Sequence, residues 1–203
     1  MGNIIIEKYR TQFSRVFAIL LIIFIIFSKS LWETQSPFFS SILFSIGVLL
    51  AAIASLGRMW CSLYIAGRKI TELVTVGPYS MTRNPLYVFS LIGALGVGLA
   101  TETLLIPLII LIAFAWFYPS VIQHEESELR AMHGEPFDAY VKAVPKFFPK
   151  ISNLNEPEEY IVKPIVFRKH IFSAVWFVWL IAILEFIDAL QALGAIPTIF
   201  KIY

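Results

Sequence analysis

The sequence predicts an all-α integral membrane protein with five transmembrane helices, and two observations carry that prediction. Of the 203 residues 58% are hydrophobic and only 15% are charged, with a mean hydropathy of +0.77. A soluble domain usually has about 25% charged residues. The apolar residues also form runs that approach the roughly 20 residues that a helix needs to cross a bilayer. Composition and run length together favour a membrane protein over a soluble domain.

Five apolar runs define the expected helices. The first two are residues 16–32 and 37–57, joined by a short polar link at 33–35. The apolar stretch 86–123 is too long for one helix, and polar residues 101–103 divide it into a hairpin of helices 86–100 and 104–122. The last run is 171–194. At 1.5 Å per residue the arm 86–100 measures only about 22 Å, so we expect it to be tilted or partly re-entrant.

The basic residues indicate how the helices are oriented. With the N-terminus inside and the C-terminus outside, 14 of the 16 Lys and Arg residues lie in cytoplasmic segments. Lys29 and Lys201 are the exceptions. Because membrane proteins concentrate basic residues in their cytoplasmic loops, this distribution supports both the number of spans and the N-in, C-out orientation.

Polar sequence lies mainly in two cytoplasmic segments, 58–85 and 124–169. Neither is long enough for a soluble domain with its own core, so any chemistry has to come from these segments and the helix ends that they join. A net charge of +2 gives no reason to expect nucleic acid. One cysteine and three histidines without ligand spacing predict no metal site.

The stretch TVGPYSMTRNPLYVF, residues 75–89, joins the first cytoplasmic segment to the third expected helix and contains two turn signals at 77–78 and 84–85. Pro85 suits the first turn of a helix, and Asn84 is a favourable N-cap. Arg83 would add a positive charge beside the free N–H groups of that helix, which makes a site for a carboxylate or phosphate. The alternative is an ordinary interfacial loop, with Arg83 on lipid phosphate and Tyr79 and Tyr87 in the aromatic belt.

The second segment begins with paired carboxylates, Glu125 and Glu126, where the fourth span runs into a charged helix. Gly134 and Pro136 interrupt that helix, and a further helical stretch follows before Pro145. Such carboxylates commonly form a solvated face. The hairpin, however, brings them to the same membrane face as Arg83, and the combination suits a zwitterionic ligand with a positive centre. The aromatic walls of that site would be Tyr79, Tyr87, Trp116 and Tyr118.

These motifs resemble those of the integral-membrane methyltransferases. The matching order is GPYSMTRNPLY, an apolar hairpin, EESEL and HGEPFDAYVKAVPKFFP. The group contains the isoprenylcysteine carboxyl methyltransferases and the phospholipid N-methyltransferases. The match implies one membrane domain over 1–203, with a methyltransferase-like core at 65–150 and additional spans in 1–60 and 170–203. Asn84 stands where many members have histidine, His133 and Phe137 replace a Phe and a Tyr, and no arginine precedes the paired glutamates.

The resemblance implies an enzyme that binds S-adenosylmethionine at the cytoplasmic ends of its helices, without a Rossmann domain. Its acceptor would be a lipid-like or prenylated carboxylate or amine that arrives from the bilayer. The implied location is a prokaryotic inner membrane, with the active site on the cytoplasmic face. The implied cofactor-binding residues are Gly77, Tyr79, Arg83, Asn84, Pro85, Tyr87, Glu125, Glu126 and Tyr140, with Pro145 also matching the motif.

Arg83 and Glu126 are the expected catalytic residues. Arg83 would hold the methionyl carboxylate, while Glu125 and Glu126 would meet the ammonium or the ribose hydroxyls. Alignment of donor and acceptor supplies most of the catalysis in such a displacement. With an amine acceptor, Glu126 or His124 would assist by taking a proton.

Two other readings stay open from the sequence. One is a nicotinamide-dependent reductase on a related scaffold, and the other is a non-catalytic membrane protein of the same fold. The acceptor is also open among prenylcysteine, phosphatidylethanolamine and other hydrophobic molecules. Glu185 and Asp188 of the last span have no assigned role.

Overall fold

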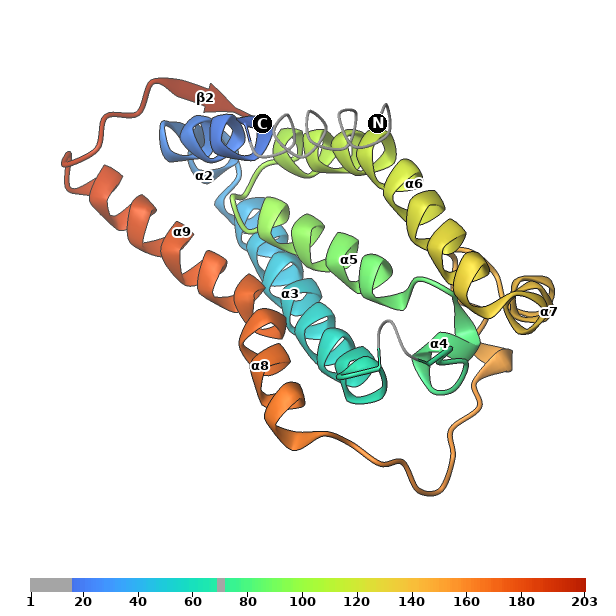
Figure 1. Cartoon of the computed structure of the whole chain (residues 1–203). Coiled ribbons are helices and arrows are strands. Elements are labelled where there is room, and N and C mark those ends of the chain that lie inside the picture. The colour runs from blue at the N-terminus through green and yellow to red at the C-terminus, as the bar shows by residue number, and fades with distance from the viewer. Residues whose placement is uncertain (1–15, 69–71) are drawn as a thin grey trace.

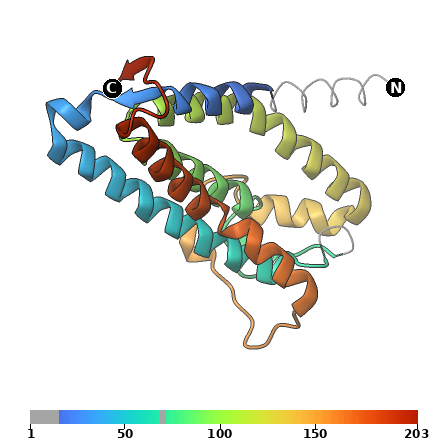
Figure 2. The same ribbon diagram turned by 90° about the vertical axis from the view of Figure 1, so that its left-hand side faces the viewer.

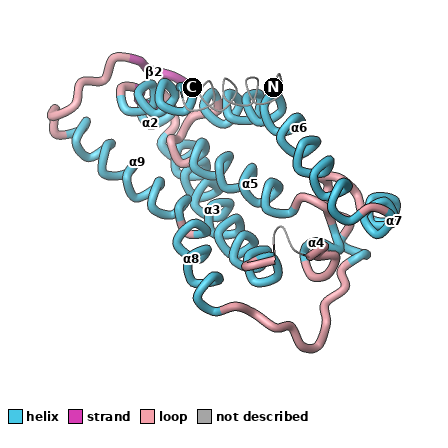
Figure 3. Tube along the Cα trace, viewed as in Figure 1, coloured by secondary structure: helices cyan, strands magenta, loops and turns pink. Residues whose placement is uncertain are grey.

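The computed structural model describes residues 16–68 and 72–203, which are mostly helical (Figures 1 and 3). The helix Val16–Ile26 comes first. The elements that follow are β1 (Ser28–Ser30), α2 (Trp32–Gln35), α3 (Pro37–Ile65), α4 (Pro78–Met81), α5 (Pro85–Leu99), α6 (Leu105–His133), α7 (Glu135–Ala143), the 3₁₀ turn η1 (Ile151–Asn153), α8 (Pro164–Ala174), α9 (Trp176–Ala192) and β2 (Phe200–Ile202).

The centre of the fold is the pairing of α3 with α5, the most extensive helix contact in the described chain. The buried face of α3 is made largely of small residues, among them Gly47, Ala51 and Ala54. A Cβ atom on Gly47 would lie 2.6 Å from the carbonyl oxygen of Gly96 and 2.6 Å from the amide nitrogen of Ala100. Small residues let two apolar helices approach until their backbones touch. Gly47 of α3 and Gly96 of α5 therefore set the distance between the two helices.

Helices α5 and α6 form the predicted hairpin, with the turn at residues 100–104. The sequence expectation that the fourth span continues into the charged segment is confirmed, because α6 runs without interruption from Leu105 to His133. Pro119 lies inside it and lacks the N–H for a helical hydrogen bond. Figures 1 and 2 show α6 bending along its length, so that its second half descends toward α7. Gly134 ends the helix with a φ of +57°.

Long-range contacts gather at two opposite ends of the bundle. At one end, β1 and β2 pair in parallel, with Lys29 opposite Lys201. Ser30 Oγ donates to the backbone carbonyl of Glu102 in the α5–α6 turn at 2.7 Å. At the other end lie α4, α7 and the start of α8 (Figure 1). There, the Arg83 amide donates to the carbonyl of Pro145 at 2.9 Å and the Lys150 amide to that of Met81 at 2.9 Å.

Three helical stretches within the described residues are long and apolar enough to cross a membrane: Pro37–Ile65, Leu105–His133 and Pro164–Ala192. The helices Val16–Ile26 and Pro85–Leu99 are apolar but shorter. The count of five spans and the N-in, C-out orientation therefore stay predictions. Lys8, Arg10, Arg15 and Lys69, which entered the charge count, lie outside the described residues.

Three expected helix boundaries were wrong. The first helix ends at Ile26 rather than 32, because residues 28–30 form the strand that pairs with β2. Helix α3 continues to Ile65 rather than ending at 57, so Arg58 lies inside an apolar helix. The last span starts earlier and consists of α8 and α9, which meet at Val175 and cross α3 (Figure 2).

Replacing Gly47 by alanine tests the close packing of α3 against α5. The new methyl group would collide with backbone atoms that cannot turn away, and we expect the free energy of unfolding to fall by about 1–3 kcal/mol. This loss should exceed the gain of about 1 kcal/mol in helix propensity. Thermal unfolding in detergent would measure it. Ala52→Leu, on an exposed face of α3, is the matched control and should leave the melting temperature within a few degrees of wild type. An unchanged or raised melting temperature for G47A would contradict the packing.

Candidate functional site

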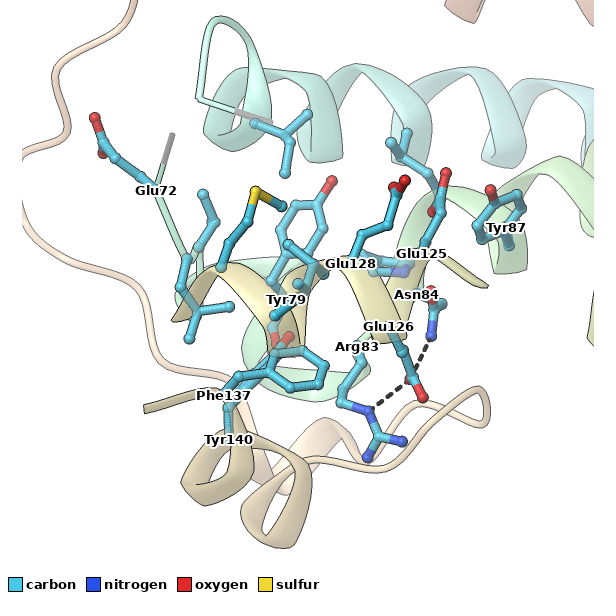
Figure 4. Close-up of a pocket in the computed structure, with 18 of the residues that line it drawn as sticks. Glu72, Tyr79, Arg83, Asn84, Tyr87, Glu125, Glu126, Glu128, Phe137 and Tyr140 are labelled. Carbon is cyan, nitrogen blue, oxygen red and sulfur yellow. Dashed lines mark hydrogen bonds and ion pairs between the residues drawn. The ribbon is translucent and has the colours of Figure 1, made fainter. Parts of the chain in front are cut away.

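A cavity of about 750 Å³ lies where α3, α4, α5, α6 and α7 meet (Figure 4). Gly77 and Pro145 do not line it, and the other residues that the sequence assigned to cofactor binding do: Tyr79, Arg83, Asn84, Pro85, Tyr87, Glu125, Glu126 and Tyr140. These residues come from three segments far apart in the chain. A volume of this size falls within the range of small-molecule sites.

Gly77 shapes the loop rather than the cavity wall. It holds a φ of +62°, a conformation that residues with a side chain rarely adopt. A Cβ atom there would lie 2.4 Å from the ring of Tyr64. Its amide donates to the carbonyl of Asn155 at 2.8 Å. Glycine at this position therefore lets α4 and its buried Tyr79 sit directly against α3 and the segment after η1.

The central interaction of the site is an ion pair between Arg83 and Glu126. The Arg83 Nε donates to Glu126 Oε1 at 2.9 Å, and the two side chains are only 10% and 16% exposed. Arg83 Nη1 also donates to the carbonyls of Val141 at 3.1 Å and Val144 at 2.6 Å. Figure 4 shows the ion pair on the side of the cavity nearest α7. Arg83 is thus the counter-ion of Glu126, and its bonds to two carbonyls hold the end of α7 in place. The sequence had predicted instead that Arg83 would be open to bind an anion.

Asn84 occupies the predicted N-cap position of α5, but its side chain does not cap the helix. Its Nδ2 instead donates to Glu126 Oε1 at 3.3 Å and to the carbonyl of Lys146 at 2.9 Å. The helix boundary was predicted from local propensity. The side chain instead binds a carboxylate and a backbone carbonyl that only the tertiary fold brings near.

Two buried tyrosines form the floor of the cavity. The Tyr140 hydroxyl donates to the Tyr79 carbonyl at 2.7 Å. Burial raises the pKa of Tyr79 well above its usual value, and burial also raises the pKa of Tyr140. The Tyr79 hydroxyl is buried and has no hydrogen-bond partner within residues 16–68 and 72–203. Both phenols therefore remain protonated near neutral pH, and Tyr79 offers a donor to a bound group.

The predicted aromatic wall is only partly present. Tyr79 and Tyr87 line the cavity. Trp116 is 79% exposed and was wrongly placed in the wall. Tyr118 packs against Phe114 with ring centroids 4.0 Å apart and against Tyr87 at 5.2 Å, so it supports the wall from behind. Phe137, which the sequence did not assign, lines the cavity from α7.

Sequence reasoning also missed polar lining residues, namely Arg58, Glu72, Ser90 and Glu128. For Arg58 a signal was available, since an ionisable residue inside an apolar span is a candidate for function. It was overlooked because the span was expected to end at residue 57. Over the described part of the chain, no group of three or more His, Cys, Asp and Glu side chains is arranged to hold a metal ion.

Comparison with known proteins gives the following matches. Residues 37–135 match the family described as phospholipid methyltransferase. The nickel-cobalt-cadmium resistance protein NccN of Alcaligenes xylosoxydans xylosoxydans is 39% identical over 173 residues, which cover 85% of this chain and 80% of NccN. The cobalt-zinc-cadmium resistance protein CzcN of Cupriavidus metallidurans is 37% identical over 175 residues, covering 86% and 80%. No solved structure matches the chain.

Because Tyr140 is buried, we expect the free energy of unfolding to fall at high pH. Unfolded tyrosine ionises near pH 10, whereas burial keeps the folded phenol neutral to a higher pH. Stability from this difference is complete below about pH 10 and falls as pH rises toward the folded pKa. For one such group the loss between pH 9 and pH 11 is about 1 kcal/mol.

Tyr140→Phe tests this pH dependence. Denaturant unfolding in detergent at pH 9 and pH 11 should show a smaller loss for the variant than for wild type. At neutral pH the variant should be about 1 kcal/mol less stable, because the Tyr79 carbonyl loses its buried donor. Equal losses in the two proteins would mean that the folded Tyr140 ionises as freely as an exposed tyrosine.

Proposed function

The chain belongs to the phospholipid methyltransferase family, and on that premise we propose that it is an S-adenosylmethionine-dependent methyltransferase acting on a lipid-like acceptor. The observation that carries the proposal is the convergence of two distant motifs on one cavity. The loop before α5 and the end of α6 meet there through the Arg83–Glu126 ion pair.

The lining side chains fit the chemistry of the methyl donor. When bound, S-adenosylmethionine supplies a methyl group activated on a sulfonium. Glu125 and Glu126 present carboxylate oxygens suited to an ammonium group or to ribose hydroxyls. Tyr79 contributes a buried hydroxyl with no hydrogen-bond partner in the described chain. The rings of Tyr87 and Phe137 offer faces that attract a cation.

Arg83 is a positioning residue in this proposal. Its bonds to the carbonyls of Val141 and Val144 keep α7 over the cavity. Its bond to Glu126 fixes the direction of that carboxylate. A fixed carboxylate aligns a bound donor, and a folded-back α7 keeps water from the reacting atoms. Alignment and exclusion of water are the main contributions that a protein makes to a displacement at a methyl group.

The acceptor in this proposal arrives from the bilayer. The cavity wall includes Ile65, Leu73, Val74, Leu86 and Leu129, so an apolar chain can lie beside the polar groups. Helices α3 and α5, which supply part of this wall, are largely apolar. We place the cavity at the cytoplasmic face of a prokaryotic inner membrane, where the positive-inside rule puts the basic residues around it.

Replacement of Glu126 by glutamine tests donor binding. The amide keeps the shape but loses the charge, and a charge-assisted hydrogen bond contributes about 1.5–3 kcal/mol. Isothermal titration of solubilised protein with S-adenosylmethionine should therefore show at least ~10-fold weaker binding for the variant. Glu159→Gln, on an exposed part of the segment before α8, is the matched control and should bind as wild type does.

The same titration separates the alternatives. Binding of NADPH in place of S-adenosylmethionine would favour the reductase reading, and binding of neither would favour a non-catalytic membrane protein. Transfer of a labelled methyl group to a membrane lipid extract, followed by mass identification of the labelled product, would name the acceptor. Wild-type protein that binds the donor yet labels no lipid would contradict a lipid acceptor.

The names of NccN and CzcN refer to metal resistance, and we propose that a similar role for this chain would depend on methylation of a membrane component. A metal-sensitive bacterium that expresses the wild-type chain should then grow at higher cobalt concentrations than one expressing Glu126→Gln at the same level. Equal growth of the two strains above the empty-vector control would show that resistance is independent of the site.

A further inference from the structure

We propose that Arg58 binds the anionic group of the acceptor, a carboxylate or a phosphate, and so positions the acceptor in the cavity. This inference rests on the proposed methyltransferase function and adds to it a residue that neither sequence motif contains. Its basis is the position of Arg58 on α3 in the cavity wall, its uncompensated charge, and its hydrogen bond to a serine on the protein surface.

Arg58 lies on α3, seven residues before the helix ends at Ile65, which is about 10 Å along the axis. Its side chain reaches across to two other helices. Nη1 donates to Ser90 Oγ of α5. Nη2 donates to Ser173 Oγ of α8 at 3.4 Å. The guanidinium therefore lies where α3, α5 and α8 meet, and it also lines the cavity.

The charge of Arg58 is not neutralised within the described chain. No carboxylate oxygen of residues 16–68 and 72–203 lies within 4.0 Å of its guanidinium. The two side chains that accept its hydrogen bonds are serines, which carry no charge. Its Nε is buried and lacks a hydrogen-bond partner among these residues. A partly buried guanidinium without a counter-ion is costly, and an anionic ligand would remove that cost.

Arg83, the other arginine in the cavity wall, does not serve this purpose. It is paired with Glu126 at 2.9 Å and bound to two backbone carbonyls. The pair has no net charge. Each terminal nitrogen of Arg58 carries two hydrogens, and each serine accepts only one of them. A guanidinium presents its N–H groups in a plane, a geometry that suits the two oxygens of a carboxylate or phosphate.

The position of Arg58 favours the acceptor over the methyl donor. Glu125, Glu126 and Tyr140 come from α6 and α7, whereas Arg58 and its serines come from α3, α5 and α8. Ser173 is exposed, and beside it Phe172 and Trp176 are 72% and 56% exposed. An apolar chain can lie on this surface while its anionic group reaches Arg58. An amphiphile from the bilayer matches that arrangement.

Titration of the full solubilised chain with single-chain amphiphiles tests the proposal without the methyl donor. The probes are dodecyl phosphate, dodecanoate and dodecyltrimethylammonium, added to protein in a neutral maltoside detergent. We expect at least one of the two anionic probes to bind ~10-fold or more tightly than the cationic one. The tighter of dodecyl phosphate and dodecanoate identifies which oxyanion the site prefers.

Variants assign the binding to Arg58. Arg58→Gln should weaken binding of the preferred anionic probe by at least ~10-fold, and Arg58→Lys should weaken it less. Arg168→Gln removes an equal charge from an exposed position on α8 and should change the affinity by less than about 2-fold. The affinity of Arg58→Gln for S-adenosylmethionine should equal that of wild type.

Several results would overturn the proposal. The first is that wild-type protein binds the cationic probe as tightly as the anionic probes. This comparison uses wild-type protein alone, so it does not depend on whether a variant folds. The second is that Arg58→Gln binds the anionic probe with the affinity of wild type. The third is that Arg58→Gln loses affinity for S-adenosylmethionine instead, which would make Arg58 part of the donor site. Failure of wild type to bind S-adenosylmethionine would contradict the proposed function alone, because binding of the amphiphiles is measured separately.

Discussion

The ion pair between Arg83 and Glu126 is the interaction on which the rest of the site depends. It joins residues 43 positions apart in the chain, one in the loop before α5 and the other near the end of α6. A buried ion pair is favourable only when the remaining polar atoms of both groups are satisfied. Here Asn84 binds the carboxylate, and the carbonyls of Val141 and Val144 bind the guanidinium. The pair therefore holds α7 against the hairpin, and this arrangement closes the cavity on one side.

The close contact between α3 and α5 determines the opposite wall. Because Gly47 and Gly96 let the two backbones touch, the end of α3 lies beside the start of α5. Arg58 can then reach Ser90 directly. A wider separation would leave its guanidinium without these neutral acceptors. Helix packing in the apolar part of the protein thus places a charge at the edge of a polar cavity.

The two arginines of the cavity illustrate how the same residue type takes different roles. Arg83 is surrounded by a carboxylate and backbone carbonyls, so its charge is neutralised by Glu126 and its bonds connect α7 to the loop before α5. Arg58 has two serines and an aromatic ring, Phe177, whose centroid is 5.9 Å from the guanidinium carbon. These uncharged neighbours hold the side chain in place but do not neutralise its positive charge, which can therefore pair with an anionic ligand. A cavity with one neutralised and one uncompensated cation fits an anionic group beside Arg58 and a cationic centre beside the carboxylates.

The sequence by itself determined the helical class, the α5–α6 hairpin, the turns at residues 77–78 and 84–85, and eight residues of the two motifs that line the cavity. These features follow from local rules: apolar run length, proline and glycine positions, and the order of two motifs. Only the tertiary structure decided the partners of Arg83 and Asn84, the outward position of Trp116 and the place of Arg58 in the wall. It also decided that residues 28–30 leave the first helix to pair with the C-terminal strand. The physical reason is the same in each case, because hydrogen bonds and ion pairs between distant segments depend on distances that no local pattern of residues encodes.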